Sequence, residues 1–224
     1  MAQVQDVASP AADKLPRGSH GLPLEFVIRS QRERLFAGMA RVMARCGYAA
    51  TTVDDIAVES GVSRKALYAH FSGKEDVLLQ AHRAVAERIK AGAGPVVVEQ
   101  PDWKAATRAL FEWTLEFFAR EPAFAHMVFV EMAAATPASR KLQRESFETI
   151  RELIQRIVAP APQATSSTAI DGMIGGLAYV ISKAAEEGEP SDLRAMTPEL
   201  MAWVALVLEG PAAAERELAG QSGI

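Results

Sequence analysis

The sequence predicts an all-α protein in which an N-terminal helix-turn-helix is joined by a fourth helix to a helical second half. Three observations lead to this prediction. Apolar residues recur every three or four positions, helix starts and ends carry Ser, Thr, Gly or Pro, and strand-like alternation is confined to residues 96–98. We expect about nine helices. The 224 residues, 49% of them hydrophobic, are enough for one large or two small cores.

The first predicted helix runs from about Val27 to Cys46 and ends at Gly47. Its apolar positions are Leu35, Met39, Val42 and Met43. Cys46 is the single cysteine of the chain, which excludes an internal disulfide framework. Because it continues the apolar pattern, we interpret it as a buried thiol.

Two short helices follow, each with its own start signal. Thr52, with Asp55 three residues later, forms a capping pattern at the first of them. Gly61 is expected to end this helix in the left-handed conformation while Val62 turns inward. Ser63 then caps the second helix. The spacing is that of a helix-turn-helix.

The second short helix has one packing face and one free surface. Leu67 and Phe71 lie four residues apart on one face, while polar side chains spread over the others. Another S-x-x-E capping box, from Ser72 to Glu75, is expected to start the fourth helix, with Lys74 at its mouth.

Cations at the start of the second helix match a recognition helix that enters the major groove of DNA. Arg64 or Lys65 could pair with guanine, whereas Tyr68, His70 and Lys74 suit phosphate oxygens. The predicted DNA contacts are Thr51, Thr52, Ser63, Arg64, Lys65, Tyr68, His70 and Lys74. The motif alone leaves a second interpretation open, because helix-turn-helix geometry also occurs in proteins that never touch DNA.

The charge distribution favours a nucleic-acid partner for the first third of the chain. The whole sequence has a net charge of -4, but residues 24–90 hold eleven Lys and Arg against eight Asp and Glu. Residues 91–224 hold eleven against eighteen. A small basic face suffices for phosphate binding, and such binding weakens steeply with added salt.

The motif residues together resemble the N-terminal signature of TetR-type (TetR/AcrR) transcriptional regulators. The resemblance rests on the runs Thr51–Val53, Asp55–Ala57, Gly61–Ser63, Leu67–Tyr68, His70–Phe71 and Lys74–Glu75. With the preceding helix it covers roughly a fifth of the chain. It implies sequence-specific DNA binding, although Arg64–Ala66 stands where many family members carry a small residue or glycine.

Three regions are expected along the chain. Residues 1–23 are predicted to form a disordered N-terminal arm, 24–73 the DNA-binding domain, and 74–224 a regulatory and dimerisation domain. The arm contains Lys14, Arg17 and His20, which could reach a minor groove, although residues 15–20 also resemble the remnant of an expression tag. No signal peptide or membrane-spanning stretch is evident in the sequence, so we expect a cytoplasmic protein without a membrane partner.

Beyond Lys90, residues Gly92, Gly94 and Pro95 are expected to break the fourth helix. Five further helices are predicted. They begin near Asp102, Pro122, Pro137, Ser166 and Thr197 and end before Gly210.

The last two predicted helices, residues 166–187 and 198–209, are apolar around most of their circumference. A helix of this kind can pack on its own domain and on a second subunit, or lie inside one large domain. Gly172, Gly175, Gly176 and Ala178 would permit close approach of another helix. The family resemblance favours a homodimer, whose two-fold symmetry would match a palindromic operator.

The middle helices are rich in aromatic residues and methionine, as expected for a dense core or an apolar ligand pocket. The resemblance implies a pocket for an unknown small hydrophobic effector that releases a repressor from DNA. The candidate pocket residues are Trp103, Trp113, Phe117, Phe124, Met127, Met132, Phe147 and Met173. A cationic effector would require Glu112, Glu116 or Glu131 to point inward.

Two other classes of protein are alternatives to a regulator. An all-α enzyme lacks support, because His82 and His126 form no close-spaced cluster with each other or with Cys46, and no nucleophile or phosphate-binding motif occurs. We therefore predict no catalytic residue, no metal and no cofactor. A helical adaptor that grips a protein is the remaining alternative, and it would show no preference for DNA sequence.

Overall fold

A computed structural model describes residues 23–162, 165–188 and 190–219, and it is all-α as predicted, with no strand among these residues. The predicted N-terminal arm lies almost wholly outside the described residues. The helices are α1 (Leu24–Ala50), α2 (Val53–Ser60), α3 (Arg64–His70), α4 (Lys74–Val98), α5 (Trp103–Arg120), α6 (Pro122–Ala125), α7 (Met132–Ala135), α8 (Pro137–Val158), α9 (Ser167–Glu187), α10 (Thr197–Glu209) and α11 (Pro211–Ala219). A π-helical turn, η1 (His126–Glu131), joins α6 to α7, and a 3-10 helix, η2 (Pro190–Met196), precedes α10.

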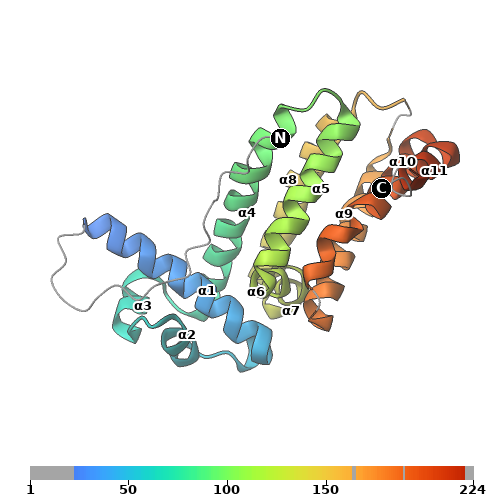
Figure 1. Ribbon diagram of the computed structural model, residues 1–224. Coiled ribbons are helices and arrows are strands. Elements are labelled where there is room, and N and C mark those ends of the chain that lie inside the picture. Colours follow the sequence, from blue (N-terminus) through green and yellow to red (C-terminus); the bar gives the residue numbers. More distant parts are fainter. Residues whose placement is uncertain (1–22, 163–164, 189, 220–224) are drawn as a thin grey trace.

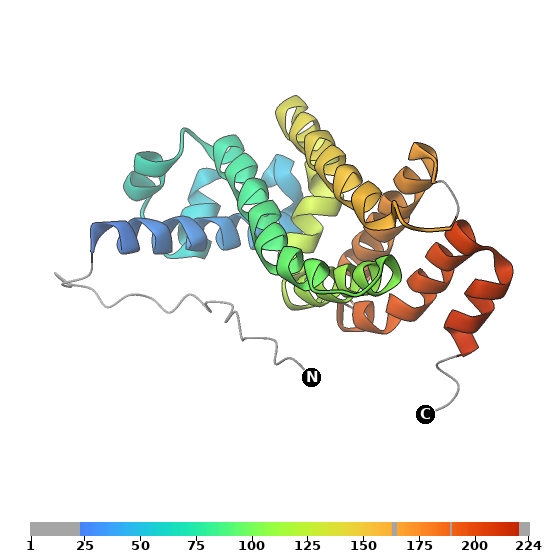
Figure 2. The same ribbon diagram turned by 90° about the horizontal axis from the view of Figure 1, so that it is seen from above.

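The short helices gather at one end of the molecule. Helices α1, α2 and α3 form a head beside the start of α4, while α4, α5 and α8 run together through the centre (Figure 1). Viewed from above, α9, α10 and α11 lie at the end opposite the head (Figure 2). The molecule is thus elongated, with α4 leading from the head into the second half.

The fourth helix is longer than predicted. It continues through Gly92, Gly94 and Pro95 to Val98, so the predicted break is wrong, and residues 96–98 are helical. Packing overrides the local signals, because Ala93 is buried and Val97 packs against the core. A Cβ on Gly92 would lie only 1.8 Å from a ring carbon of Trp113, so glycine makes room for this indole.

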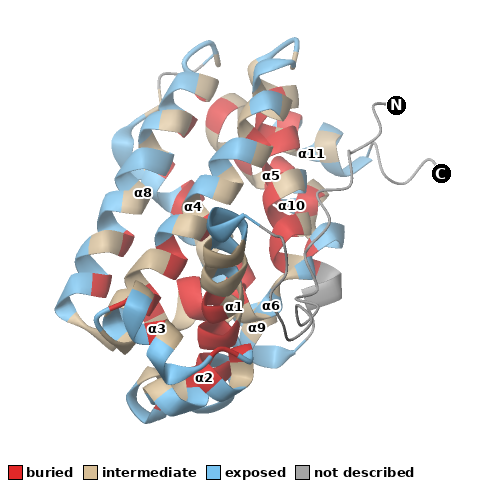
Figure 3. Cartoon of the chain, turned by 90° about the vertical axis from the view of Figure 1, so that its left-hand side faces the viewer, coloured by how far each residue is buried: buried red, intermediate tan, exposed pale blue. Residues whose placement is uncertain are grey.

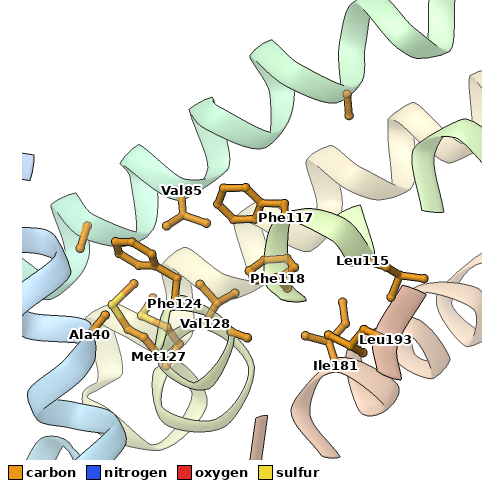
Figure 4. Packing of buried hydrophobic residues seen from close by; sticks show 14 of the residues in the cluster. Ala40, Val85, Leu115, Phe117, Phe118, Phe124, Met127, Val128, Ile181 and Leu193 are labelled. Carbon is orange, nitrogen blue, oxygen red and sulfur yellow. The ribbon is translucent and has the colours of Figure 1, made fainter. Parts of the chain in front are cut away.

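One hydrophobic cluster extends from the head into the second half. It contains Leu35 and Met39 of α1, Leu78 of α4, Phe118 of α5 and Met127 of η1. Figure 4 shows Val85, Phe117, Phe124 and Val128 meeting between α4, α5 and the turn that follows α6. The two halves therefore share a core, and the domain boundary at residues 73 and 74 stays a prediction.

The end of the chain adds a helix that the sequence did not predict. Helix α11 packs on α10, and two ion pairs connect it to α5: Arg108 Nη2 lies 2.5 Å and Lys104 Nζ 3.6 Å from the Glu217 carboxylate. Lys104 Nζ also lies 2.6 Å from Glu209 Oε2, at the end of α10. Pro211 starts α11 at the first helical position, where a proline leaves no helical partner unsatisfied. These charges join the last helix to the centre of the fold.

Cys46 is exposed, so its predicted burial is wrong. The apolar face of α1 is buried up to Met43, but the helix kinks at Gly47, where φ is 74°. The Cys46 thiol lies in this last turn and donates to the Val42 carbonyl oxygen, 3.3 Å away.

Candidate nucleic-acid interface

The first helix of the turn motif begins at the predicted cap. The Thr52 hydroxyl accepts a hydrogen bond from the Asp55 backbone N–H at 3.1 Å, and the Asp55 carboxylate accepts one from the Thr52 N–H at 3.0 Å. The Thr52 hydroxyl also donates to Asp55 at 2.6 Å, and these bonds hold the pKa of Asp55 below its usual range. The predicted capping box is therefore confirmed.

The corner between α2 and α3 also forms as predicted. Gly61 adopts the left-handed conformation, with φ 62° and ψ 29°, and the Val62 N–H donates to the Ala57 carbonyl at 3.1 Å. Val62 is buried, and the Ser63 hydroxyl caps α3 by accepting from the Ala66 N–H at 3.1 Å. Each of these hydrogen bonds joins two residues that are only a few positions apart in the sequence. The angle between α2 and α3 therefore depends on local geometry.

Helix α3 presents a polar surface over a small apolar anchor. Leu67 is fully buried and Phe71, which follows the helix, is 2% exposed, as predicted. Arg64, Lys65 and Tyr68 are exposed, and the exposed residues of α3 are visible beside α2 at the lower end of the molecule (Figure 3). This is the arrangement that a recognition helix requires.

Arg64 has a partner on the surface. Its guanidinium lies 3.0 Å from the Asp54 carboxylate and 5.9 Å from the centre of the Tyr68 ring, and both members of the ion pair are more than half exposed. An exposed ion pair contributes only about 0–1 kcal/mol, so Arg64 can leave it when a stronger acceptor arrives.

Three predicted contacts have structural partners inside the protein. Thr51 is 1% exposed and its hydroxyl donates to the Gly47 carbonyl at 2.7 Å. The His70 Nε2 atom lies 2.9 Å from the Gln31 amide oxygen. The Lys74 ammonium donates to the carbonyls of residues 48, 49 and 51, at 3.0, 3.4 and 2.8 Å. These side chains hold the head together, and their DNA contacts stay predictions.

The start of α4 differs from the prediction. Ser72 does not form a capping box with Glu75; its backbone N–H and hydroxyl donate to Asp76 at 2.9 and 3.3 Å. Gly73 is the residue before the helix and provides no side-chain cap. The S-x-x-E pattern places the acidic partner three residues after the serine. It does not predict Asp76, because this residue lies four positions after Ser72.

Helix α1 supports the helix-turn-helix, as its apolar pattern predicts, but it also does so through polar side chains that the sequence did not identify. Gln31 holds His70, while Arg32 lies 5.0 Å from the centre of the Phe71 ring and donates to Gln80 of α4 at 2.5 Å. These contacts connect residues 39 and 48 positions apart. No local signal could have identified them, because each bond joins two different helices that are far apart in the sequence.

The predicted pocket residues lie in or against the common core. Phe117, Phe124, Met127, Met132 and Met173 are buried, and Trp103, Trp113 and Phe147 are partly buried. The Trp113 and Phe117 rings stack with centroids 5.5 Å apart, and the Arg88 guanidinium lies 5.0 Å from the centre of Phe117. Packing in this core accounts for the burial of these residues, and their role in a ligand pocket stays a prediction.

The three glutamates of the middle helices do not come together as a binding site for a cationic ligand. Glu112 is exposed, Glu116 pairs with Arg120 and Arg194, and Glu131 accepts a hydrogen bond from the Tyr48 backbone N–H at 2.8 Å. Among the described residues, no group of three His, Cys, Asp or Glu side chains could hold a metal ion. No described helix is long and apolar enough to cross a membrane.

A capped helix-turn-helix head on a larger helical body defines a class of DNA-binding transcriptional regulators. Residues 35–81 match the family model of the bacterial regulatory proteins of the tetR family. The helix-turn-helix of this chain is thus similar to that of the tetR family over about a fifth of the chain, at the residues on which the sequence resemblance rests.

Curated relatives match part of the chain. The uncharacterized HTH-type transcriptional regulator YerO of Bacillus subtilis is 43% identical over 54 residues, which are 24% of this chain and 19% of YerO. The HTH-type transcriptional activator FasR of Mycolicibacterium smegmatis is 24% identical over 129 residues, 58% of this chain and 59% of FasR. The chain thus spans about a fifth and three fifths of the lengths of these two relatives.

Solved structures match most of the fold. The fatty acid degradation regulator FadR from Bacillus halodurans has a TM-score of 0.73 at 20% identity, covering 80% of this chain and 95% of its own. FadR from Bacillus subtilis, solved in complex with stearoyl-CoA, has a TM-score of 0.69 at 17% identity, covering 79% and 97%. The helical second half therefore has the same architecture as theirs.

Proposed function

We propose that this protein is a ligand-responsive homodimeric repressor that binds a palindromic operator through α3. The observation that carries the proposal is the free surface of α3. Arg64, Lys65 and Tyr68 are exposed, while Leu67 and Phe71 fix the helix from below. A short, anchored helix with cations in its first turns can enter a major groove without rearrangement.

Base reading is assigned to the first turn of α3. Arg64 and Lys65 are long enough to reach guanine N7 and O6, and the exposed ion pair of Arg64 with Asp54 can open on binding. Tyr68 is half exposed one turn later and suits a phosphate oxygen. Lys74 contributes to binding on all sequences alike, through phosphate or through the carbonyl groups that it holds.

A selection of bound DNA from randomised oligonucleotides tests this assignment. We expect a palindromic consensus and an affinity that falls steeply with added salt. Arg64→Ala and Lys65→Ala should lower discrimination between the consensus and altered sequences, each by about 1–3 kcal/mol. Lys74→Ala should weaken binding to all DNA alike, and Lys141→Ala, on an exposed site of α8, should change nothing. A uniform loss in all three variants of the head would contradict the assignment of the base readers.

The dimer is proposed to form through α9 and α10. Gly172 and Gly175 of α9 have open space where a Cβ would stand, and Tyr179 on the same side is 67% exposed. Gly176 faces inward instead, because a Cβ there would lie 3.1 Å from the Trp203 ring of α10. The sides of α9 are thus divided between the domain core and a surface open to a second copy.

Ultracentrifugation of the protein at several concentrations tests the dimer. Gly175→Glu should yield a monomer, because it places a charge on the proposed interface. Gly94→Glu is a matched control: it is also a helical glycine with open space around its Cβ, but it lies on α4. A wild-type monomer at micromolar concentration, or equal dimers in both variants, would contradict the proposal.

The effector is proposed to be a hydrophobic small molecule, with long-chain acyl-CoA as the first class to test. Support comes from the apolar side chains between α4, α5 and the turn after α6, and from the stearoyl-CoA complex of Bacillus subtilis FadR. A ligand releases DNA only if it binds the DNA-incompatible state more tightly.

A comparison of stearoyl-CoA, stearate and free CoA shows whether the acyl chain, the CoA group or both are needed for an effect. We expect stearoyl-CoA to raise the melting temperature and to release the selected operator, and free CoA to do neither. If none of these compounds and no member of a broad hydrophobic library has either effect, the effector proposal fails while DNA binding stands.

A further inference from the structure

The end of α1, from its kink at Gly47 onwards, has an unusual backbone and lies next to the helix-turn-helix. Gly47 has φ 74° and ψ 164°, a conformation in which a side chain is strained. Thr51 then leads directly into the Thr52 cap of α2. The segment from Gly47 to Thr51, here called the hinge turn, therefore sets where the helix-turn-helix begins.

The start of α4 holds the hinge turn from one side. The Lys74 ammonium donates to the carbonyl oxygens of Tyr48 and Thr51, at 3.0 and 2.8 Å, and lies 4.4 Å from the centre of the Tyr48 ring. One cation thus binds both ends of a four-residue stretch. A hydrogen bond from a charged ammonium group to a carbonyl oxygen is stronger than one from a neutral donor.

The second half of the molecule holds the same turn from the other side. The Glu131 carboxylate accepts a hydrogen bond from the Tyr48 backbone N–H at 2.8 Å, and a Cβ on Gly47 would lie 3.5 Å from Glu131 Oε1. Glu131 is the last residue of η1, in which the N–H of Met132 donates to the carbonyl of Met127 five residues earlier. This wide turn packs against both α1 and α9.

We propose that Glu131 is a positioning residue for DNA binding, which pre-orders the hinge turn and thereby the start of α2 before DNA arrives. The inference rests on the proposed function. Glu131 touches no DNA; it acts through Tyr48. A turn that is already ordered does not lose this conformational freedom on binding, so the complex forms with higher affinity.

The bond also connects the head to the part of the protein where an effector is proposed to act. Glu131 and Tyr48 are 83 residues apart, one in η1 and the other in α1. Because η1 packs on α9 as well as on α1, a shift of η1 would change the Glu131–Tyr48 distance. The hinge turn is then looser in one state of the second half than in the other.

The experiment compares Glu131→Ala with Glu131→Gln in the full chain. Alanine removes the acceptor, whereas glutamine keeps an oxygen that can accept from the Tyr48 N–H. Glu112→Ala, at an exposed position of α5, is the control. Affinity is measured for the DNA that the wild-type protein selects, and amide hydrogen exchange is followed in residues 47–53 and in α8.

We expect Glu131→Ala to lower operator affinity about five- to tenfold, within the range of typical couplings between sites. Exchange should become faster in residues 47–53 and stay unchanged in α8, and Glu131→Gln should restore most of both values. Unchanged or raised affinity in Glu131→Ala, or faster exchange throughout the protein, would overturn the inference. If the wild-type protein selects no DNA, the proposed function fails instead, while the exchange data still test the contact between Glu131 and the hinge turn.

Discussion

The head and the second half of this protein hold their shapes in different ways. In the head, short-range side-chain bonds fix the starts of the two short helices, because Thr52 caps α2 and Ser63 caps α3. In the second half, aromatic and aliphatic side chains from different helices pack together, as Phe118 of α5 does with Phe129 of η1. The helix-turn-helix of the head is therefore encoded mainly locally, and the second half mainly by packing.

The difference explains where functional residues stand out. In the head, burial alone distinguishes the exposed cations Arg64 and Lys65 from the buried Leu67 beneath them. In the second half, candidate ligand-binding residues and core residues are the same apolar types. Four experiments test this contrast, and the largest effect is expected in the packed half.

Phe118→Ala should cause the largest loss of stability. The ring is fully buried and makes edge-to-face contacts with Phe117 and Phe129, at centroid distances of 5.0 and 4.9 Å. We expect the free energy of unfolding to fall by about 3–5 kcal/mol in urea titrations. Phe118→Leu, which keeps most of the volume, should cost less than half as much. A loss below about 1 kcal/mol for alanine would show that this core is not closely packed.

A pH titration is expected to have the next largest effect. Burial, assisted by the nearby Arg83 charge, lowers the pKa of His82 from 6.5 to about 4. The unfolded chain therefore binds a proton between these values that the folded protein does not, so stability falls as pH drops from about 6.5 towards 4. We expect a loss of roughly 2–3 kcal/mol over this range, because His82 is only 4% exposed.

His82→Gln is the control for this titration. The imidazole Nε2 lies 2.8 Å from the Ser146 hydroxyl of α8, and an amide can keep a hydrogen bond there without titrating. Urea denaturation of both proteins between pH 7 and 4 measures the difference. An equal pH dependence in the two proteins would assign the effect to other groups.

Gly92→Ala and Gly94→Ala should have opposite effects. A Cβ at position 92 would overlap the Trp113 ring, so we expect a loss of about 1–3 kcal/mol. Position 94 has open space, and alanine there should stabilise the helix by up to about 1 kcal/mol. Thermal or urea unfolding measures both. If the two variants behave alike, contact with Trp113 does not explain why α4 needs glycine at position 92.

Thr52→Ala should have the smallest effect of the four. It removes the cap of α2 and both bonds that the Thr52 hydroxyl shares with Asp55, for an expected loss of about 1 kcal/mol. Thr52→Ser keeps the hydroxyl and should behave like the wild type in urea titrations. A loss as large as that of Phe118→Ala would break the contrast between a locally encoded head and a packed second half.

The same contrast decides how much could be predicted from sequence. Thr52, Gly61 and Ser63 were placed correctly, because each of these signals acts on its own neighbours. The break at Gly92 was wrong because the contact that explains this glycine comes from Trp113, in another helix. The helix after Gly210 was missed because its ion pairs with α5, from Glu217 to Arg108 and Lys104, join residues more than a hundred positions apart.

For the candidate interface, sequence identified the exposed Arg64, Lys65 and Tyr68, because helical periodicity separates them from Leu67. It did not show that Thr51 and Lys74 have partners inside the protein. Both bind carbonyl groups of the hinge turn, and the path of a kinked chain does not follow from residue types.

The π-helical turn at His126–Glu131 changes the direction in which the side chains after it point. Each residue of an α-helix advances the side-chain direction by about 100°, so one extra residue in a turn rotates everything that follows relative to what precedes it. Phe124 and Met127 face the common core, while Glu131 meets Gly47 and Tyr48. A homologue without the inserted residue would turn a different side chain towards the hinge, even with the same residues on both flanks.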